Sequence, residues 1–246
     1  MPEHELWFTA LFNKYLSGPA NAALSLVGLH AENPAKPWAN FITMEILVVA
    51  ILMIVAAMLR PKLSVDQPGK LQHTFEILYG FLRGQSEEVI GHHGPHFLRL
   101  FATLFFFILA CNLIGIVPTF ESPTMFVPVP LGCALVTFGY YHYMGLKEQG
   151  AGNYLKHFTG GVPWILVPLI VPIEIISHLA RPLSLTIRLF ANMFAGEQVT
   201  IVFLMLTYFI APVIFMGLHV FVAFLQAYIF ALLTMVYVQG AVSHEH

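Results

Sequence analysis

Long apolar runs separated by short polar stretches dominate the chain. Residues 41–59 form the first run, in which Glu45 is the one charged residue. Its length is close to the ~20 apolar residues that a helix needs to cross the hydrocarbon core of a bilayer. Residues 97–118 and 126–145 form two further runs, separated by a short turn that contains Glu121 and Pro123. The pattern predicts three membrane-spanning helices in the first 145 residues.

Two other segments are amphipathic rather than apolar throughout. Between residues 71 and 90, apolar residues recur at helical spacing among polar ones, namely Leu71, Phe75, Leu78, Leu82 and Val89. This spacing predicts a helix that lies along the membrane surface or is covered by a partner, and does not span. Residues 1–38 are mixed, with an amphipathic patch expected to rest at the interface, made of Leu6, Trp7, Leu11 and Tyr15.

The last third of the chain holds two apolar runs that are longer than a bilayer requires, residues 162–195 and 199–238. A continuous helix over the first would be about 51 Å long, against a hydrocarbon core of about 30 Å. Several prolines could kink these runs, but no polar turn interrupts either of them. We therefore expect two long antiparallel helices, tilted by roughly 50° and joined at residues 196–198.

Together these patterns predict an all-α integral membrane protein with about five spans, an interfacial amphipathic helix and a terminal hairpin of two long, strongly tilted helices. The expected segments are an N-terminal extracytoplasmic segment (1–40), the first transmembrane helix (41–60), a cytoplasmic-side loop with the amphipathic helix (61–96), a transmembrane hairpin (97–145), a cytoplasmic loop (146–161), the long hairpin (162–241) and a C-terminal tail (242–246).

The basic residues predict the orientation. With the N-terminus outside, seven of them fall on or near the cytoplasmic side: Arg60, Lys62, Lys70, Arg83, Arg99, Lys147 and Lys156. Only Lys14 and Lys36 then lie outside. Because cytoplasmic loops carry the excess of Lys and Arg, we expect an external N-terminus and a cytoplasmic C-terminus.

The composition is typical of a membrane protein and reduces the number of possible functions. The chain is 58% hydrophobic and 10% charged, and its net charge of −2 argues against a nucleic-acid partner. The first residues lack the pattern of a secretory signal or a transit peptide, which favours a bacterial plasma membrane. His92, His93 and His96 could bind a metal, but without a carboxylate or cysteine at ligand spacing we favour a solvated loop. No metal or cofactor is expected.

Arg188 is the residue that most restricts the function. It lies in an otherwise apolar stretch, where a guanidinium costs about 2.5–3.5 kcal/mol even on mild insertion scales. It cannot lose its proton, because arginine stays charged in proteins. An expensive and permanent charge predicts a role in ion movement across the membrane.

Further polar residues share the helix face of Arg188. At 100° per residue, five of them fall within about 40° of its direction: Glu174, Ser177, Arg181, Ser184 and Asn192. Glu197 would point to the opposite side if the helix continues that far, and His219 and Gln226 share one face of the second long helix. Two polar stripes suggest aqueous routes that end inside the membrane. Two alternatives stay open: Ser177, Ser184 and Gln226 as helix–helix contacts only, and Arg181 as a partner of Glu174 or a side chain reaching the interface.

At this point the chain resembles subunit a of the F-type ATP synthases, the stator half of the membrane proton channel. The resemblance rests on residues 182–197 (PLSLTIRLFANMFAGE), 225–230 (LQAYIF) and 112–118 (NLIGIVP), and it covers the chain from about residue 40. It implies two aqueous half-channels that carry protons to and from the ring of c subunits, which couples proton flow to rotation and ATP synthesis. The implied partners are the c ring, a peripheral stalk of b or b/b′ subunits, the rest of the F1Fo complex and membrane lipid.

The resemblance also implies roles for individual residues. Arg188 corresponds to the essential arginine that faces the acidic residue of each c subunit. The implied outer access channel contains Glu197, His219 and Gln226; the implied cytoplasmic exit contains Glu174, Ser177 and Arg181; the channel-lining or packing positions are Asn192, Ser184 and Asn112. Some relatives carry an acidic residue where this chain has Gly115, so the outer vestibule is expected to use other groups, with Glu121 and the histidines as candidates.

Other classes of protein fit the sequence less well. A secondary transporter, the main alternative, would usually show an inverted repeat, and none is visible. A membrane cytochrome needs paired histidines on facing helices, whereas we expect His142, His178 and His219 to be isolated on their spans. No hydrolase motif and no phosphate-binding loop is present, so nucleotide chemistry is expected on another chain. The choice between H⁺ and Na⁺ stays open, because the carboxylate site on the partner sets it.

Overall fold

The computed structural model describes residues 5–26, 28, 31, 33–64, 67–117, 119–150, 152, 154, 166–206 and 210–242. Within these ranges the regular structure is helical and no strand occurs. The helices are α1 (Trp7–Leu26), α2 (Asn40–Leu59), α3 (Lys70–Ile90), α4 (Gly94–Ile114), α5 (Pro128–Gln149), α7 (Val167–Leu206) and α8 (Ile210–Val242), with short 3₁₀ turns at Arg60–Lys62 and Pro123–Met125. The predicted all-α fold is confirmed.

The apolar runs and the amphipathic segment became the expected helices, and apart from the turn between the last two helices their boundaries lie a few residues from those predicted. Four described helices, α2, α4, α7 and α8, are long and apolar enough to cross a membrane. α5 is also long, but its second half carries Tyr140, Tyr141, His142 and Lys147, which lower its hydropathy. The fifth span therefore stays a prediction.

The predicted position of the last turn is wrong. α7 continues through Gly196, Glu197 and Gln198 as far as Leu206, and α8 begins at Ile210. A glycine costs a helix only about 1 kcal/mol, and Glu and Gln are good helix formers, so three polar residues do not end a helix. Thr200 Oγ1 donates a hydrogen bond to the carbonyl of Gly196 at 2.8 Å, as a threonine within a helix does. Residues 207–209, between the two helices, lie outside the described ranges.

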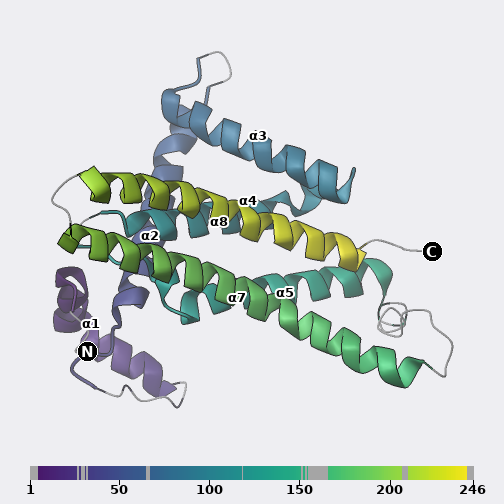
Figure 1. The fold of residues 1–246 in the computed structure, drawn as a ribbon, viewed down its shortest axis with the longest axis horizontal. Coiled ribbons are helices and arrows are strands. Elements are labelled where there is room, and N and C mark those ends of the chain that lie inside the picture. Colours follow the sequence, from purple (N-terminus) through teal and green to yellow (C-terminus); the bar gives the residue numbers. More distant parts are fainter. Residues whose placement is uncertain are drawn as a thin grey trace.

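α7 and α8 run antiparallel and side by side across the molecule, with α4 and α5 packed against them (Figure 1). The core lies where these four helices meet, and Phe101, Phe105 and Phe230 are fully buried in it. α7 contributes Leu185, Leu189 and Met193, which are spaced four residues apart and so occupy one stripe of the helix. The rest of its circumference is largely open.

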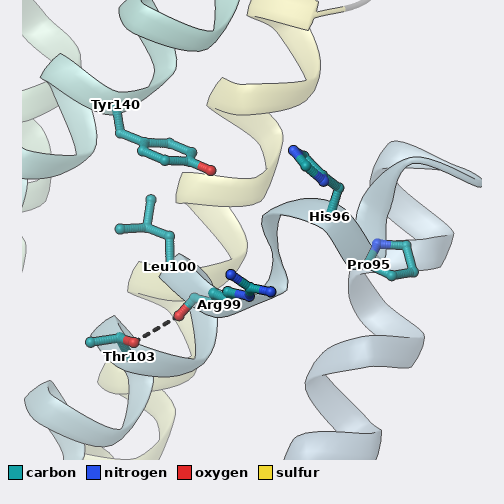
Figure 2. A pocket seen from close by; sticks show the side chains of 6 residues that line it. All are labelled: Pro95, His96, Arg99, Leu100, Thr103 and Tyr140. Atoms are coloured by element: carbon teal, nitrogen blue, oxygen red, sulfur yellow. Dashed lines mark hydrogen bonds between the residues drawn. The ribbon is translucent and has the colours of Figure 1, made fainter.

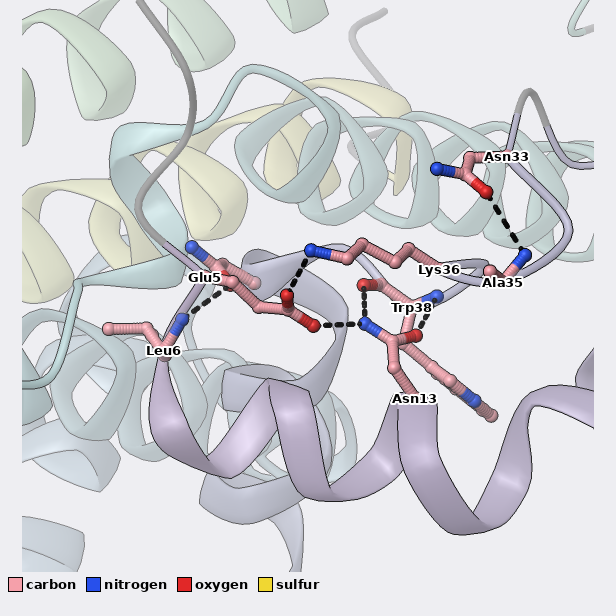
Figure 3. A network of polar contacts seen from close by, with 8 residues as sticks. Glu5, Leu6, Asn13, Asn33, Ala35, Lys36 and Trp38 are labelled. Carbon is pink, nitrogen blue, oxygen red and sulfur yellow. Dashed lines mark hydrogen bonds and ion pairs between the residues drawn. The ribbon is translucent and has the colours of Figure 1, made fainter.

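Hydrogen bonds attach α1 to the segment that leads into α2 (Figure 3). Asn13 Nδ2 donates to Glu5 Oε1 at 2.8 Å and to the Trp38 carbonyl at 3.3 Å, while the Trp38 N–H donates to Asn13 Oδ1 at 3.0 Å. Lys36 forms an ion pair with Glu5, and its hydrogen bond together with that of Asn13 lowers the pKa of the Glu5 carboxyl. These contacts give the N-terminal segment a defined structure. Its position at a membrane interface stays a prediction.

Candidate functional site

Arg188 lies on α7 at the edge between the buried stripe and the open side of the helix. Leu189 is fully buried, Ile187 is 54% exposed, and Arg188 itself is half-buried. Among the described residues no carboxylate forms an ion pair with its guanidinium. A permanent charge within an apolar helix is costly without a counter-charge, and the open side of α7 leaves the guanidinium accessible to one.

The polar residues that share the face of Arg188 follow the same edge. Ser177, Ser184 and Asn192 are exposed, whereas Glu174 and Arg181 are half-buried. Apolar neighbours such as Leu183, 58% exposed, surround this line. α7 therefore presents a line of polar groups within an apolar surface, along the edge of the side that no described helix covers.

One turn beyond Arg188, a hydrogen bond joins the two long helices. Asn192 Nδ2 donates to Gln226 Oε1 at 2.8 Å, and the Gln226 side chain is only 2% exposed. The bond connects α7 to α8 one turn from Arg188. It joins two residues that were both predicted to belong to the proton path. A contact role and a channel role are both compatible with this geometry.

The next turn of α7 brings His219 close to Gly196. A Cβ at position 196 would lie 3.1 Å from His219 Nδ1, so any side chain there would crowd the imidazole. His219 lines two cavities at this point. One, of about 260 Å³, also contains Asn192, and the other, of about 430 Å³, also contains Glu197. The histidine thus stands between a polar group near Arg188 and an acidic group farther along α7.

Glu197 belongs to the larger of these two cavities. Since α7 continues past it, its position nine residues after Arg188 places it on the opposite side of the helix, as expected for a continuing helix. Its Oε2 is buried and has no hydrogen-bond partner within the described part of the chain. Glu121 lies near enough for the two carboxyl groups to interact. The cavity therefore contains one acidic group and one imidazole among mostly apolar side chains.

Gly115 lines the same cavity, and its surroundings explain the missing acidic side chain. A Cβ there would lie 2.9 Å from Ser122 Cβ and 3.0 Å from the Ser122 nitrogen. Ser122 cannot retreat easily, because its hydroxyl donates to the Cys111 carbonyl at 2.9 Å. Of the candidates for the outer vestibule, His219 lines this cavity and Glu121 lies near its Glu197. His92, His93 and His96 lie around the start of α4, at the other end of that helix.

Asn112 makes structural contacts. Its Nδ2 donates to the carbonyl of Ala223 on α8 at 3.2 Å, and its Oδ1 accepts from Thr124 Oγ1 at 2.6 Å. The residue is fully buried. Both ends of the amide are hydrogen-bonded. Of the two roles predicted for Asn112, channel lining and packing, this geometry favours packing.

Near the start of α7, the prediction of isolated histidines is wrong for two of the three. The rings of His142 on α5 and His178 on α7 lie 5.2 Å apart, centroid to centroid. His178 Nε2 is 3.2 Å from Glu174 Oε1, and the Arg181 guanidinium lies over the rings of Tyr141 and Tyr237. Glu174 thus contacts a histidine, and Arg181 contacts aromatic rings rather than Glu174.

Sequence reasoning missed this cluster because helical periodicity gives the face of each residue but not which helix meets that face. The signal present was weak: Tyr141 and His142 on an otherwise apolar run, and His178 one turn from Glu174. Only the packing of α5 against α7 brings these groups together.

Other cavities lie away from the polar line of α7. One of about 810 Å³ is lined by His96, Arg99, Leu100, Thr103 and Tyr140, with Pro95 at its edge (Figure 2). Thr103 Oγ1 is occupied by a hydrogen bond to the Arg99 carbonyl at 2.7 Å. His92, His93 and His96 line another cavity with Glu148, but within the described ranges no group of three such side chains could hold a metal ion.

Comparisons with known proteins show the family of the chain. The profile of the family described as ATP synthase A chain matches residues 41–239. The chain is 62% identical to ATP synthase subunit a of Solibacter usitatus over 236 residues, which cover 96% of this chain and 100% of the relative. It is 50% identical to ATP synthase subunit a of Koribacter versatilis over 243 residues (99% of each chain) and 44% identical to that of Desulfosudis oleivorans over 200 residues (81% and 86%).

Proposed function

Since the chain belongs to the ATP synthase A chain family, we propose that it forms two aqueous half-channels that carry protons to and from a ring of c subunits. Membership of the family makes it a multi-pass membrane subunit of the F1Fo ATP synthase complex. In the proposed mechanism, proton flow through the half-channels turns the ring and drives ATP synthesis on other chains. A secondary transporter has no support from the relatives.

The observation that carries the proposal is the half-buried Arg188 on the open side of α7, without an ion pair among the described residues. A carboxylate on a passing ring helix would supply the missing counter-charge. The fixed positive charge favours the ionised form of that carboxylate, so a ring subunit that reaches Arg188 gives up its proton. Arg188 also opposes a direct leak, because a proton beside it meets charge repulsion in a low dielectric.

The outer half-channel would run along the side of α7 that carries Glu197, opposite Arg188. Glu197 and His219 share the cavity of about 430 Å³, and His219 shares the cavity of about 260 Å³ with Asn192. Asn192 is hydrogen-bonded to Gln226, one turn from Arg188. A proton that enters at Glu197 would pass His219 and neutralise a ring carboxylate near the Asn192–Gln226 pair. The neutral carboxyl can then face lipid at a much lower cost than the ion.

The inner half-channel would begin at Arg188 and follow the polar line towards Ser184, Ser177 and Glu174. In the proposed orientation this end of α7 faces the cytoplasm, the N-terminus lies outside, and the membrane is a bacterial inner membrane. The stalk of b or b/b′ subunits would hold the chain against the turning ring. Asn112 would contribute by holding α4 to α8, and Arg181 by lining the exit.

A disulfide cross-link tests whether the ring passes the open side of α7. In the assembled complex, Ser184→Cys is combined with a cysteine placed next to the acidic residue of subunit c. Ser184 is exposed on the line of Arg188, so oxidation is expected to link the two subunits and stop ATP-driven proton pumping, and a reductant is expected to restore it.

The matched control is Val49→Cys on α2, an exposed position (41%) on another membrane helix. The native Cys111 and Cys133 are buried and should not react. A cross-link from Val49→Cys in place of Ser184→Cys would put the ring on the wrong side of the molecule and contradict the proposal.

A further inference from the structure

A line of hydrogen-bonding groups crosses from α5 to α7 next to the polar line of Arg188. The hydroxyl of Tyr141 lies 3.0 Å from His178 Nδ1, and His178 Nε2 lies 3.2 Å from Glu174 Oε1. Tyr141 is 1% exposed and His178 is 7% exposed, so both are shielded from bulk water. The imidazole thus joins a phenol on one helix to a carboxylate on the other.

The chemistry of the three groups gives this line a direction. An ionised carboxylate can only accept hydrogen bonds, and a neutral imidazole has one donor and one acceptor nitrogen. The Tyr141 hydroxyl donates to Nδ1 when the imidazole carries its own proton on Nε2. Nε2 lies 3.2 Å from Glu174 Oε1 without the geometry of a hydrogen bond, so the carboxylate has to turn towards the ring before a proton can be handed on to it.

We propose that His178 is a proton carrier of the inner half-channel, which passes protons from the neighbourhood of Arg188 to Glu174. This inference rests on the proposed function. His178 is ten residues before Arg188, about 15 Å along the helix, and Glu174 is about 6 Å farther. A carrier at this place divides a distance that a proton cannot cross in one transfer.

The transfer conserves protons. Nδ1 takes up a proton delivered along the channel, either from water or through the Tyr141 hydroxyl, which accepts one proton as it donates its own. Nε2 releases its proton to Glu174 Oε1, and the imidazole is neutral again. Glu174, which is half-buried, then loses the proton to water at the end of the helix. The next cycle requires the ring to return to its first tautomer.

Arg181 packs against the aromatic rings beside this carrier. Its guanidinium carbon lies 5.8 Å from the ring centroid of Tyr141 and 5.2 Å from that of Tyr237, within the range of cation–π contacts. The polar groups in contact with His178 itself include Glu174 on α7 and Tyr141 and His142 on α5. Arg181 thus helps to hold the ring of Tyr141, whose hydroxyl contacts His178 Nδ1.

His142 provides a matched control within the same cluster. Its ring lies 5.2 Å from that of His178, and its Nδ1 is 2.6 Å from the Tyr154 hydroxyl, which directs this hydrogen bond away from Glu174. The two histidines have similar surroundings, but only the contact of His178 with Glu174 extends the line along α7.

The test is passive proton flux through the membrane sector of the complete complex in vesicles, measured after F1 has been removed. His178→Ala is expected to reduce the flux about tenfold or more, in line with the loss of a positioned proton-transfer group. Added imidazole should restore part of this flux, since it can occupy the space left by the side chain. His142→Ala should stay within about twofold of wild type and should not respond to imidazole.

Two further variants make the result decisive. Glu174→Gln combined with His178→Ala should be no slower than the slower single variant, because both act on one line. Tyr141→Phe keeps the ring beneath Arg181 and removes only the hydroxyl; a severalfold loss of flux is expected, and this variant decides the matter if His178→Ala does not assemble.

Unchanged flux in an assembled His178→Ala complex would overturn the proposal. So would a flux that imidazole does not restore, or restores equally in vesicles carrying His142→Ala. If Arg188→Ala abolishes pumping while His178→Ala has no effect, the carrier is wrong and the half-channel function stands. Normal pumping by Arg188→Ala would instead contradict the function itself.

Discussion

Replacing Arg188 with alanine is expected to abolish ATP-driven proton pumping in vesicles while the complex stays assembled. Arg188 makes no ion pair among the described residues, so its removal breaks no ion pair within them. In the proposed mechanism it removes the fixed charge that discharges each ring carboxylate and separates the two half-channels. The measurement is acidification of vesicles that contain the purified complex, together with the amount of this subunit retained in it.

Lysine at the same position should not restore coupled transport, although the charge is kept at neutral pH in water. A buried ammonium can lose its proton, and it lacks the planar fork that holds a carboxylate through two hydrogen bonds. We expect Arg188→Lys to assemble and to fail in pumping. Arg60→Ala, in the 3₁₀ turn after α2, is the control and should pump normally. Normal pumping by either Arg188 variant would show that the arginine is structural and would contradict its proposed place between the half-channels.

Replacing Gly196 with leucine is expected to lower proton pumping about tenfold or more, which corresponds to a barrier increase of at least ~1.4 kcal/mol. Its Cβ alone would come within 3.1 Å of His219 Nδ1, and the rest of the side chain would extend into the cavity of about 260 Å³ shared with Asn192. The imidazole would have to move, and water would lose its space. α7 itself should not be weakened, since leucine favours a helix more than glycine does.

A matched glycine lies close by on α8. Gly217 has no atom within 4 Å of the position its Cβ would take, so Gly217→Leu should leave pumping unchanged. Adding His219→Ala to Gly196→Leu should relieve the crowding but not restore transport, because the imidazole is itself proposed to carry protons. Equal pumping by Gly196→Leu and the wild type would show that the space around His219 is not part of the route.

Hydropathy predicted the helices well because the membrane imposes length and apolar content together. Residues 41–59 were expected as a span and became α2, Asn40–Leu59; the amphipathic segment from residue 71 became α3, Lys70–Ile90. The hairpin turn was placed wrongly at residues 196–198. A polar interruption marks a change in environment, whereas the end of a helix depends on backbone conformation, and glutamate and glutamine favour the helix.

The sequence predicted which face of its helix each candidate site residue occupies, but not which residues it contacts on other helices. Arg188 was identified because a charged side chain has a high free-energy cost in lipid. The helical periodicity placed Glu174 and Asn192 on the same side of the helix. The hydrogen bond from Asn192 to Gln226, the approach of His219 to Gly196 and the contact of His178 with Tyr141 all depend on how two helices meet. One sequence, read helix by helix, does not contain that information.

The open side of α7 also has a consequence for friction. Leu183 and Ile187, each more than half exposed, carry side chains without hydrogen-bonding groups. Their contacts with a moving partner would be dispersion contacts, worth only ~0.1–0.2 kcal/mol for each pair of atoms and without preferred direction. A partner sliding past such a surface exchanges one weak contact for another and meets no deep energy well. The buried stripe holds α7 in the core, while its open side is apolar. In the proposed function, α7 would resist sideways force and still bind the passing ring only weakly through this apolar surface.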